Sequence, residues 1–373
     1  MKLALVSVRG IPNHYGGLEE FAENVSVRLV QRGHEVIVYS PSFHPYTGSE
    51  FKGVKIVRKW SPEKQIGAAA NFIYDYLSLR DSLIKDCDAV LVCGYAAAAI
   101  WYYVLPIKKT LLITNIDGLE WKRAKWSRTV QKLFLWFESI ALRKSDVIIA
   151  DNPGIADYLL ENFQLPSVGI AYGADIVINP DESILSKFGL KKYDYNVIIG
   201  RLEPENNIEV ILDGVAKSES KQAMHIFAND NTRYGRYLKD KYKEMGDKII
   251  FHGWTSGQHV LGNLRYFANL YFHGHSVGGT NPSLLEAMAG RAFIVAHNNP
   301  FNKYVLGEDA LYFYTADDIK RCIDQCAELT KDRPLFIERN LEKIRKEYNW
   351  DTITDKYEQM FVSERKKWVE KNR

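Results

Sequence analysis

The sequence has few cysteines for its length, little net charge, and no uninterrupted apolar run long enough to cross a membrane. Its 373 residues include four cysteines, too few for a disulfide framework, so we expect a reducing, cytoplasmic environment. A net charge of +3 does not indicate nucleic acid as the partner, and the sequence has no basic tract or zinc-finger spacing that would. The longest apolar stretch, residues 90–107, contains Gly94 and Pro106, which predicts a strand and a helix instead of a membrane span.

The motifs of a bound metal ion or a nicotinamide cofactor are also missing. His273 and His275 lack a third ligand at a suitable spacing, and zinc sites need at least three protein ligands. Gly16 and Gly17 follow the first apolar run, but they do not form the G-x-G-x-x-G pattern of dinucleotide-binding proteins. We therefore expect neither a metal ion nor a cofactor.

Short apolar runs alternate with amphipathic stretches along the whole chain. This pattern is typical of βαβ units, whose parallel strands are buried on both faces. The expected strands are LALVSV, EVIVYS, VKIVRKW, AVLVCG, TLLITN and DVIIAD, followed by NVIIGR, AMHIFA, KIIFHG, NLYFHG, AFIVAH and ALYFY. Because 373 residues exceed what one core usually organises, we predict an α/β fold with two doubly wound domains, residues 1–175 and 176–350. The active site is expected in a cleft between them.

One stretch, LYFHGHSVGGTNPSLLEAMAGR (residues 270–291), predicts a strand, a glycine loop and the start of a helix. Gly278 and Gly279 permit a tight turn, Asn281 can cap the helix, and Pro282 suits its first position. Unpaired N–H groups at such a helix start favour an anion, most often a phosphate. Glu286 follows in the first turns of the helix, where its carboxylate can accept hydrogen bonds from ribose hydroxyls. The stretch therefore predicts a site for a nucleotide that carries a sugar.

Each candidate residue also has a purely structural interpretation. The helix dipole alone favours Glu286 near a helix start. Arg201 follows the strand NVIIG, where its guanidinium can bind a phosphate through two hydrogen bonds or can be a surface side chain. Asp117 follows the strand TLLITN, where it can act as a general base or merely end the strand in an Asp-Gly turn. His275 can bind a donor sugar or phosphate, or can be a buried structural histidine.

Several segments resemble one known family in the same order along the chain. GRLEPENNIEVILDG (residues 200–214) and the loop before Glu286 are similar to the donor domain of retaining glycosyltransferases of family 4, whose fold is called GT-B. RGIPNHYGGLEEF (residues 9–21) and NIDGLEWKRAKW (residues 115–126) resemble the subgroup of bacterial rhamnosyltransferases that build surface polysaccharides. The resemblance implies two Rossmann-like domains and a final helix, residues 351–373, that crosses back to the first domain.

The resemblance also implies roles for particular residues, with Asp117, Arg201 and Glu286 as the catalytic ones. The donor-binding residues would be Gly16, Gly17, Arg201, Asn207, His275, Gly278, Gly279, Thr280, Asn281 and Glu286. The family usually has lysine where this chain has Asn207 and a second glutamate where it has Gly278. Stabilisation of the leaving group would therefore depend more on Arg201 and the helix start, and the missing carboxylate fits a 6-deoxy sugar or a different orientation of the donor sugar.

A basic and aromatic stretch lies between residues 121 and 144. It contains seven lysines or arginines, one acid, Glu138, and the aromatic residues Trp121, Trp126, Phe134, Trp136 and Phe137. Such a composition suits a peripheral contact with anionic lipid headgroups. It equally suits an amphipathic helix that packs its aromatic side chains into the core.

On this resemblance, we expect transfer of L-rhamnose from dTDP-L-rhamnose to a hydroxyl of a glycan or lipid-linked glycan, with retention of the anomeric configuration. The reaction would take place in the cytoplasm, at the inner face of the membrane if the acceptor is lipid-linked. Three alternatives stay open: a UDP-sugar as the donor, a sugar-nucleotide epimerase of similar build, and a nucleotide-sugar sensor without catalytic activity.

Overall fold

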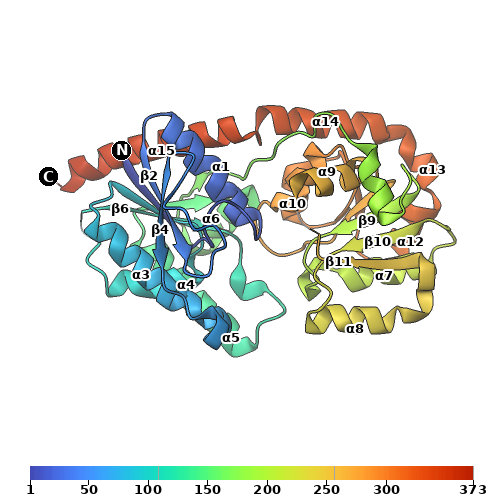
Figure 1. The fold of residues 1–373 in the computed structure, drawn as a ribbon, viewed down its shortest axis with the longest axis horizontal. Helices are drawn as coiled ribbons and strands as arrows, with labels where there is room; N and C mark the ends of the chain where they lie inside the picture. Colours follow the sequence, from blue (N-terminus) through green and yellow to red (C-terminus); the bar gives the residue numbers. More distant parts are fainter. Residues whose placement is uncertain (108, 256, 373) are drawn as a thin grey trace. The chain divides into compact units, whose positions relative to one another are not determined.

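The computed structural model describes residues 1–107, 109–255 and 257–372, and the chain divides into two compact units. Unit 1 comprises Met1–Lys122, Trp126–Tyr172 and the chain from Trp350 onward. Unit 2 comprises Gly173–Asn349 together with Arg123–Lys125. Each unit consists of a β-sheet with helices packed against it (Figure 1).

Unit 1 is built on an eight-stranded sheet with the strand order β3-β4-β2-β1-β5-β6-β7-β8. The strands are β1 (Lys2–Val6), β2 (Glu35–Pro41), β3 (Glu50–Phe51), β4 (Val54–Lys59), β5 (Ala89–Val92), β6 (Leu111–Ile116), β7 (Val147–Ala150) and β8 (Val168–Gly169). β3 pairs with β4 in the antiparallel sense, and the other pairs are parallel. Every residue of β5, β6 and β7 is buried, as expected for parallel strands covered on both faces.

Helices cover both faces of the unit 1 sheet. They are α1 (Gly17–Gln31), α2 (Glu63–Ile66), α3 (Ala70–Ile84), α4 (Tyr95–Ala98), α5 (Arg128–Lys144), α6 (Pro153–Phe163) and α15 (Trp350–Asn372). Figure 1 shows α1 beside α15 on one side of the sheet, and α3 beside α4 on the other.

The last helix, α15, packs on unit 1. Its Glu358 forms an ion pair with Arg32 at 2.8 Å and a hydrogen bond with His34 at 2.9 Å, and both residues lie just beyond the end of α1. Tyr357 contacts Phe21 of α1, with 5.1 Å between the ring centroids. The expectation that the final helix returns to the first part of the chain is therefore confirmed for the residues described, which exclude Arg373.

Unit 2 is built on a six-stranded parallel sheet with the order β11-β10-β9-β12-β13-β14. The strands are β9 (Tyr195–Ile199), β10 (Ala223–Phe227), β11 (Ile249–Gly253), β12 (Leu270–His273), β13 (Ile294–His297) and β14 (Leu311–Phe313). Numbered within the unit, this order is 3-2-1-4-5-6, which is that of doubly wound nucleotide-binding domains.

The helices of unit 2 also lie on both sides of its sheet. They are α7 (Ile208–Lys217), α8 (Arg233–Lys241), α9 (Gln258–Tyr266), α10 (Pro282–Ala289), α11 (Pro300–Leu306), α12 (Ala316–Asp324), α13 (Cys326–Leu329) and α14 (Arg333–Lys346). Figure 1 shows α9, α10 and α14 on one side and α7 and α8 on the other. Between sheet and helices, a core cluster includes Ile198, Ile211, Ile226, Phe272 and Ile319.

The apolar runs of the sequence all form strands, and residues 90–107 include β5, α4 and a 3-10 turn at Ala99–Tyr103, as predicted. The strands that the pattern did not predict are β3 and β8. Each has two residues, which is too short to show a hydrophobic period. Within the described residues, none of the helices has the length and apolarity that a membrane span requires. All four cysteines are free and buried.

Candidate functional site

The strand order of unit 2 reverses between β9 and β12, which are neighbours in the sheet. β9 pairs with β12 through Asn196 with Leu270 and Val197 with Tyr271, while β10 lies on the far side of β9 and β13 on the far side of β12. In doubly wound sheets, ligands bind beyond the carboxyl ends of the strands at such a reversal. The loops that follow β9 and β12 are the two predicted donor-binding segments, so the fold brings both to this position.

Hydrogen bonds join these two loops to each other. Asn207 Nδ2 donates to the Gly274 carbonyl at 2.8 Å. Ser276 donates twice to the Glu205 carbonyl, from its backbone N–H at 3.1 Å and from Oγ at 2.7 Å. We call these contacts, together with the one between Asn206 and His275 described below, the loop clamp.

Gly274 lets the two loops approach this closely. A Cβ atom at this position would lie 1.9 Å from the Asn206 carbonyl oxygen, which is far inside van der Waals contact. On the other loop, Asn207 has a φ of 50°, a left-handed conformation that asparagine adopts more readily than most residues. The geometry therefore gives Asn207 the role of holding the two loops together.

His275 is held at both its ring and its carbonyl. Asn206 Nδ2 donates to the Arg201 carbonyl at 2.8 Å, so Asn206 Oδ1 faces His275 Nδ1 as an acceptor at 2.7 Å. Burial lowers the pKa of His275 well below its usual value, so the ring is neutral, with its proton on Nδ1 and its acceptor nitrogen at Nε2. The His275 carbonyl accepts hydrogen bonds from Asn299 and Asn302, each at 3.0 Å.

His273, at the end of β12, is a buried structural histidine. It is 5% exposed, and burial followed by the charge of Arg265 lowers its pKa to about 3. Its ring centroid lies 6.1 Å from that of His275. Within the described residues, no group of three or more His, Cys, Asp or Glu side chains could hold a metal ion.

The start of α10 has the predicted cap. Asn281 Oδ1 accepts a hydrogen bond from the backbone N–H two residues later at 2.9 Å, and Pro282 is the first helical residue. Gly278 has a φ of 117°, which favours glycine, and Gly279 leads to the buried Thr280. The first turn of α10 contains no acidic residue, so the partial positive charge of the helix start is not neutralised locally.

Glu286 is anchored by two side chains of α9. Its Oε2 accepts a hydrogen bond from Arg265 Nη2 at 2.6 Å, and its Oε1 accepts one from Gln258 Nε2 at 3.0 Å. The Arg265 side chain is 2% exposed and that of Glu286 is 20% exposed, so the carboxylate is held from the buried side and reaches the surface. Because each carboxylate oxygen can accept more than one hydrogen bond, Glu286 keeps the capacity to bind ribose hydroxyls.

Arg201 lies at the carboxyl end of β9, two residues after Ile199, the last residue of the strand. Its side chain is exposed, while its backbone carbonyl is fixed by Asn206. A guanidinium at this edge can bind a phosphate that the start of α10 also attracts.

In unit 1, Asp117 follows β6 and is half-buried. Tyr172 Oη donates to Asp117 Oδ1 at 2.5 Å, and Asn115 Nδ2 donates to Tyr172 Oη at 3.3 Å. Burial, followed by the charge of Asp117, raises the pKa of Tyr172 well above its ordinary value, so the phenol stays protonated. Gly118 has a φ of 102°. The carboxylate is therefore fixed in orientation at a turn that ends the strand.

Gly16 and Gly17 begin α1, after the loop that follows β1. Gly16 is the N-cap residue, and no side chain caps the helix. Its N–H donates to Asn13 Oδ1 at 3.2 Å. The first turn of α1 contains Glu19 and Glu20. Because carboxylates occupy this helix start and not that of α10, the start of α10 is the stronger anion site of the two.

The structure thus groups the predicted residues by unit. Two adjacent loops and one helix of unit 2 carry Arg201, Asn207, His275, Gly278, Gly279, Thr280, Asn281 and Glu286. Unit 1 carries Gly16 and Gly17 after β1, and Asp117 after β6.

Among the residues that shape the site of unit 2 but were not predicted from the sequence are Asn206, Gly274, Arg265, Asn299 and Asn302. The glycine directly after the apolar run NLYFH was a usable signal for a close backbone approach. The other four make contacts between separate elements and leave no local pattern.

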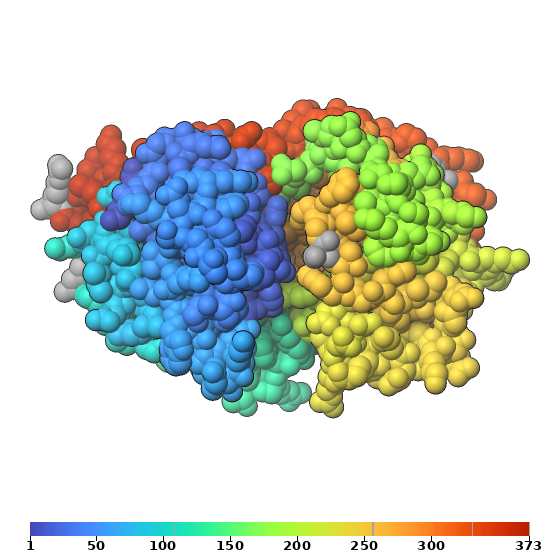
Figure 2. Space-filling view, in the orientation of Figure 1, coloured from blue at the N-terminus to red at the C-terminus, as the bar shows by residue number. Residues whose placement is uncertain are grey.

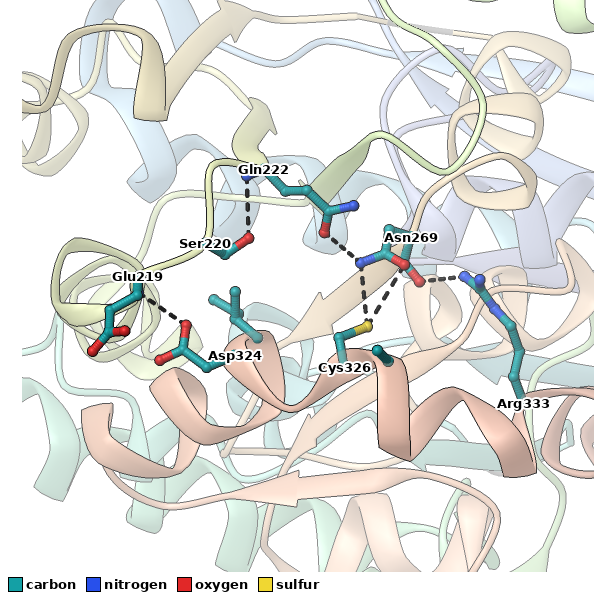
Figure 3. A pocket seen from close by; sticks show the side chains of 9 residues that line it. Glu219, Ser220, Gln222, Asn269, Asp324, Cys326 and Arg333 are labelled. Atoms are coloured by element: carbon teal, nitrogen blue, oxygen red, sulfur yellow. Dashed lines mark hydrogen bonds between the residues drawn. The ribbon is translucent and has the colours of Figure 1, made fainter.

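A pocket of about 570 Å³ opens at the opposite edge of the unit 2 sheet (Figure 3). Gln222 and Asn269 directly precede β10 and β12, and they share a hydrogen bond of 2.8 Å. Arg333 donates to the carbonyls of Ala268 and Asn269. Ligands of doubly wound sheets bind at the carboxyl edge, so this pocket at the amino edge is not the candidate site.

Comparison with known protein families and a curated relative indicates a glycosyltransferase. Residues 181–349 match the family described as Glycosyl transferases group 1, and residues 1–175 match a domain of unknown function (DUF1972). A curated relative, the uncharacterized glycosyltransferase MJ1069 of Methanocaldococcus jannaschii, is 21% identical over 93% of this chain and 95% of its own length.

Solved structures share the fold at low sequence identity. Sucrose-phosphate synthase from Thermosynechococcus elongatus aligns with a TM-score of 0.81 and 15% identity, over 97% of this chain and 98% of its own. Anabaena Alr3699/HepE in complex with UDP-glucose aligns with a TM-score of 0.75 and 13% identity, over 97% of this chain and 99% of its own. The chain therefore has the predicted GT-B fold. Within that fold class, its residues 181–349 form a glycosyltransferase group 1 domain.

Gly274→Ala is expected to open the loop clamp, because the added Cβ would meet the Asn206 carbonyl oxygen at 1.9 Å. We expect the free energy of unfolding to fall by about 1–3 kcal/mol, the usual cost of forcing an atom into a packed site. UDP serves as the probe for nucleotide binding. If binding has to restore the loop contacts at a similar cost in free energy, the affinity for UDP should fall about tenfold. Urea unfolding and titration calorimetry measure these two quantities.

The matched control is Gly200→Ala in the neighbouring loop, where a Cβ would meet no atom within 4 Å. Wild-type UDP affinity in the Gly274→Ala variant would show that the loop clamp does not shape the binding site.

Proposed function

We propose that this protein is a retaining glycosyltransferase that moves L-rhamnose from dTDP-L-rhamnose to a hydroxyl of a glycan or lipid-linked glycan. The observation that carries the proposal is the loop clamp beside the start of α10. Around one strand reversal of unit 2 stand an exposed arginine, an uncompensated helix start and an anchored carboxylate, where doubly wound domains bind nucleotides.

The parts of a nucleoside diphosphate sugar match these groups. The start of α10 and Arg201 suit the diphosphate, because both carry positive charge and donate hydrogen bonds. Glu286 suits the free hydroxyl of the nucleotide's pentose, and the neutral His275 ring can accept a hydrogen bond from a hydroxyl of the donor sugar at Nε2. Position 278 is glycine where related enzymes usually have glutamate, which favours a donor sugar that lacks a hydroxyl, such as a 6-deoxy sugar.

A UDP-sugar is the second candidate for the donor. It is favoured by the structure of the Anabaena protein, which was solved with UDP-glucose. UDP also has a 2′-hydroxyl that dTDP lacks, and the carboxylate of Glu286 has lone pairs for two neighbouring hydroxyls.

Retention requires the acceptor to attack from the face that the diphosphate leaves. In the proposed mechanism, Arg201 and the N–H groups at the start of α10 stabilise the negative charge that grows on the leaving diphosphate. Because the acceptor attacks from that same face, no protein nucleophile is needed, and the departing phosphate accepts the proton of the incoming hydroxyl. Asp117, whose orientation is fixed by Tyr172, would orient the acceptor hydroxyl.

A lipid-linked acceptor would bring the protein to a membrane surface, and α5 offers a contact for it. Leu133, Leu135 and Trp136 are 42%, 36% and 47% exposed, and the helix ends with Arg143 and Lys144. Part of the stretch 121–144 is visible at the surface in Figure 2. Exposed apolar side chains next to cations suit anionic headgroups.

The same helix also packs into unit 1. Phe137 is 4% exposed, and Glu138 is fully buried and accepts hydrogen bonds from Tyr95 at 3.2 Å and Tyr158 at 2.6 Å. One face of α5 therefore packs into unit 1, and the exposed side chains of the same helix are the ones that we propose for the membrane contact.

The proposal is tested by incubating the protein with dTDP-L-rhamnose or UDP-glucose, alone and with a panel of saccharide and lipid-linked saccharide acceptors. Transfer should require an acceptor, and NMR of the product should show the anomeric configuration of the donor. An isomerised donor without any acceptor would identify an epimerase, and binding without transfer or hydrolysis would identify a sensor. Either result would overturn the proposal.

Arg201→Ala is expected to lower kcat by about 100-fold, the effect of removing one donor to a developing oxyanion. The exposed guanidinium makes little contact with the fold, so the melting temperature should stay near that of the wild type. Initial rates with the active donor and thermal melts measure the two effects.

The matched control for this substitution is Arg233→Ala, an exposed arginine at the start of α8. Unchanged kcat in the Arg201→Ala enzyme would contradict the role given to Arg201.

Replacing Leu133 and Trp136 together by serine is expected to weaken binding to vesicles of phosphatidylglycerol. Each lost apolar side chain removes about 1.5–3 kcal/mol of burial if it enters the lipid fully, so a loss of about tenfold or more is expected for the pair. Vesicle co-sedimentation measures this loss of binding. Vesicles of phosphatidylcholine, which carry no net charge, should bind both the wild type and the double variant weakly.

Leu160→Ser on α6 is the control, because Leu160 is 59% exposed and lies outside the stretch 121–144. Equal vesicle binding by the double variant and the wild type would mean that α5 has no membrane role.

A further inference from the structure

Arg265 of α9 is the largest fully buried side chain of the described residues, at 1% exposure. Its Nη2 donates to Glu286 Oε2 at 2.6 Å and to Ser283 Oγ at 3.3 Å. Its guanidinium also lies 5.8 Å from the ring centroid of Tyr271. Arg265 therefore connects α9 to the first two turns of α10 and to β12 from beneath the candidate site.

The contacts of Ser283 extend this network to the neighbouring loop. Ser283 Oγ lies 2.8 Å from Tyr271 Oη and 3.3 Å from the carbonyl oxygen of Ile199, to which it donates. Ile199 ends β9, two residues before Arg201. One buried guanidinium thus stabilises the positions of both elements that carry the proposed diphosphate ligands.

A buried arginine is costly for folding. Removing its charge from water is unfavourable unless good partners replace the solvent, and Arg265 Nε and Nη1 have no hydrogen-bond partner among the residues described. Arg265 and Glu286 are also exposed to different degrees, since their side chains are 2% and 20% exposed. The buried cation is therefore placed to hold a carboxylate whose other side faces outward.

We propose that Arg265 is a positioning residue for the nucleotide, which fixes the Glu286 carboxylate so that it accepts hydrogen bonds from the sugar of the nucleoside diphosphate. This inference rests on the proposed function of unit 2 as the donor-binding unit. Arg265 itself does not touch the nucleotide. It holds Oε2 and, through Ser283, the end of β9, while Gln258 holds Oε1.

The alternative is that the ion pair between Arg265 and Glu286 only stabilises the fold. The two differ in what Arg265→Met should do, because a structural pair affects stability and a positioning pair also affects nucleotide affinity. We expect Arg265→Met to weaken UDP and dTDP binding by about 10- to 100-fold, the range for a lost hydrogen bond to a charged group. In turnover, the KM for the donor should rise by more than kcat falls.

Arg333→Met is the matched control, since Arg333 is also an arginine of unit 2 packed on aromatic rings, 4.8 Å from Tyr193 and 5.4 Å from Phe293. It donates to carbonyls at the other edge of the sheet. The Arg333→Met substitution should lower the melting temperature without changing the Kd for UDP.

Arg265→Lys keeps the charge, so it tests the positioning role even if Arg265→Met does not fold. An ammonium can reach Glu286 or Ser283 but lacks the planar fork of arginine, so we expect a folded protein with UDP affinity between those of wild type and Arg265→Met. Calorimetry with UDP and dTDP on wild type and all three variants is the experiment.

The outcomes separate the two proposals. Wild-type UDP affinity in folded Arg265→Lys and Arg265→Met would overturn the positioning role while leaving the proposed function intact. A wild-type protein that binds neither UDP nor dTDP would overturn the proposed function, and the positioning role with it. A loss of affinity confined to the Arg265 variants, and absent from Arg333→Met, supports the inference.

Discussion

The close approach of two loops at the carboxyl ends of β9 and β12 is the constraint on which the candidate site depends. It is possible because residue 274 is glycine, whose missing Cβ leaves room for the Asn206 carbonyl. Once the loops meet, Asn207 donates a hydrogen bond to the Gly274 carbonyl and Ser276 donates to the Glu205 carbonyl. The loop clamp therefore places Arg201 and the turn before α10 on the same edge of the sheet.

The positive charge at this edge of the unit 2 sheet has two sources. Asn207 ties the loops and carries no charge, so the positive potential comes from Arg201 and from a helix start with no acidic residue in its first turn. The corresponding helix start in unit 1 has two glutamates in its first turn. The two units share an architecture, but the start of α10 in unit 2 is the more favourable of the two helix starts for an anion.

Much of this fold could be predicted from the sequence, because buried parallel strands appear as apolar runs and helix starts carry local capping signals. The strands β9 to β14 and the Asn281 cap follow directly from such patterns. Arg265 and Asn299 could not be predicted, since their partners lie 21 and 24 residues away and belong to other elements. The positions of residues that make long-range side-chain contacts depend on packing, which no local period encodes. For the same reason, the sequence could identify Glu286 as a candidate but not the guanidinium beneath it.

The most direct test of the site is a crystal structure of this protein grown with UDP. We predict that the diphosphate lies at the start of α10 within hydrogen-bonding distance of Arg201, with the ribose hydroxyls on Glu286. Electron density for UDP at the other edge of the unit 2 sheet, in the pocket lined by Asn269 and Arg333, would contradict it.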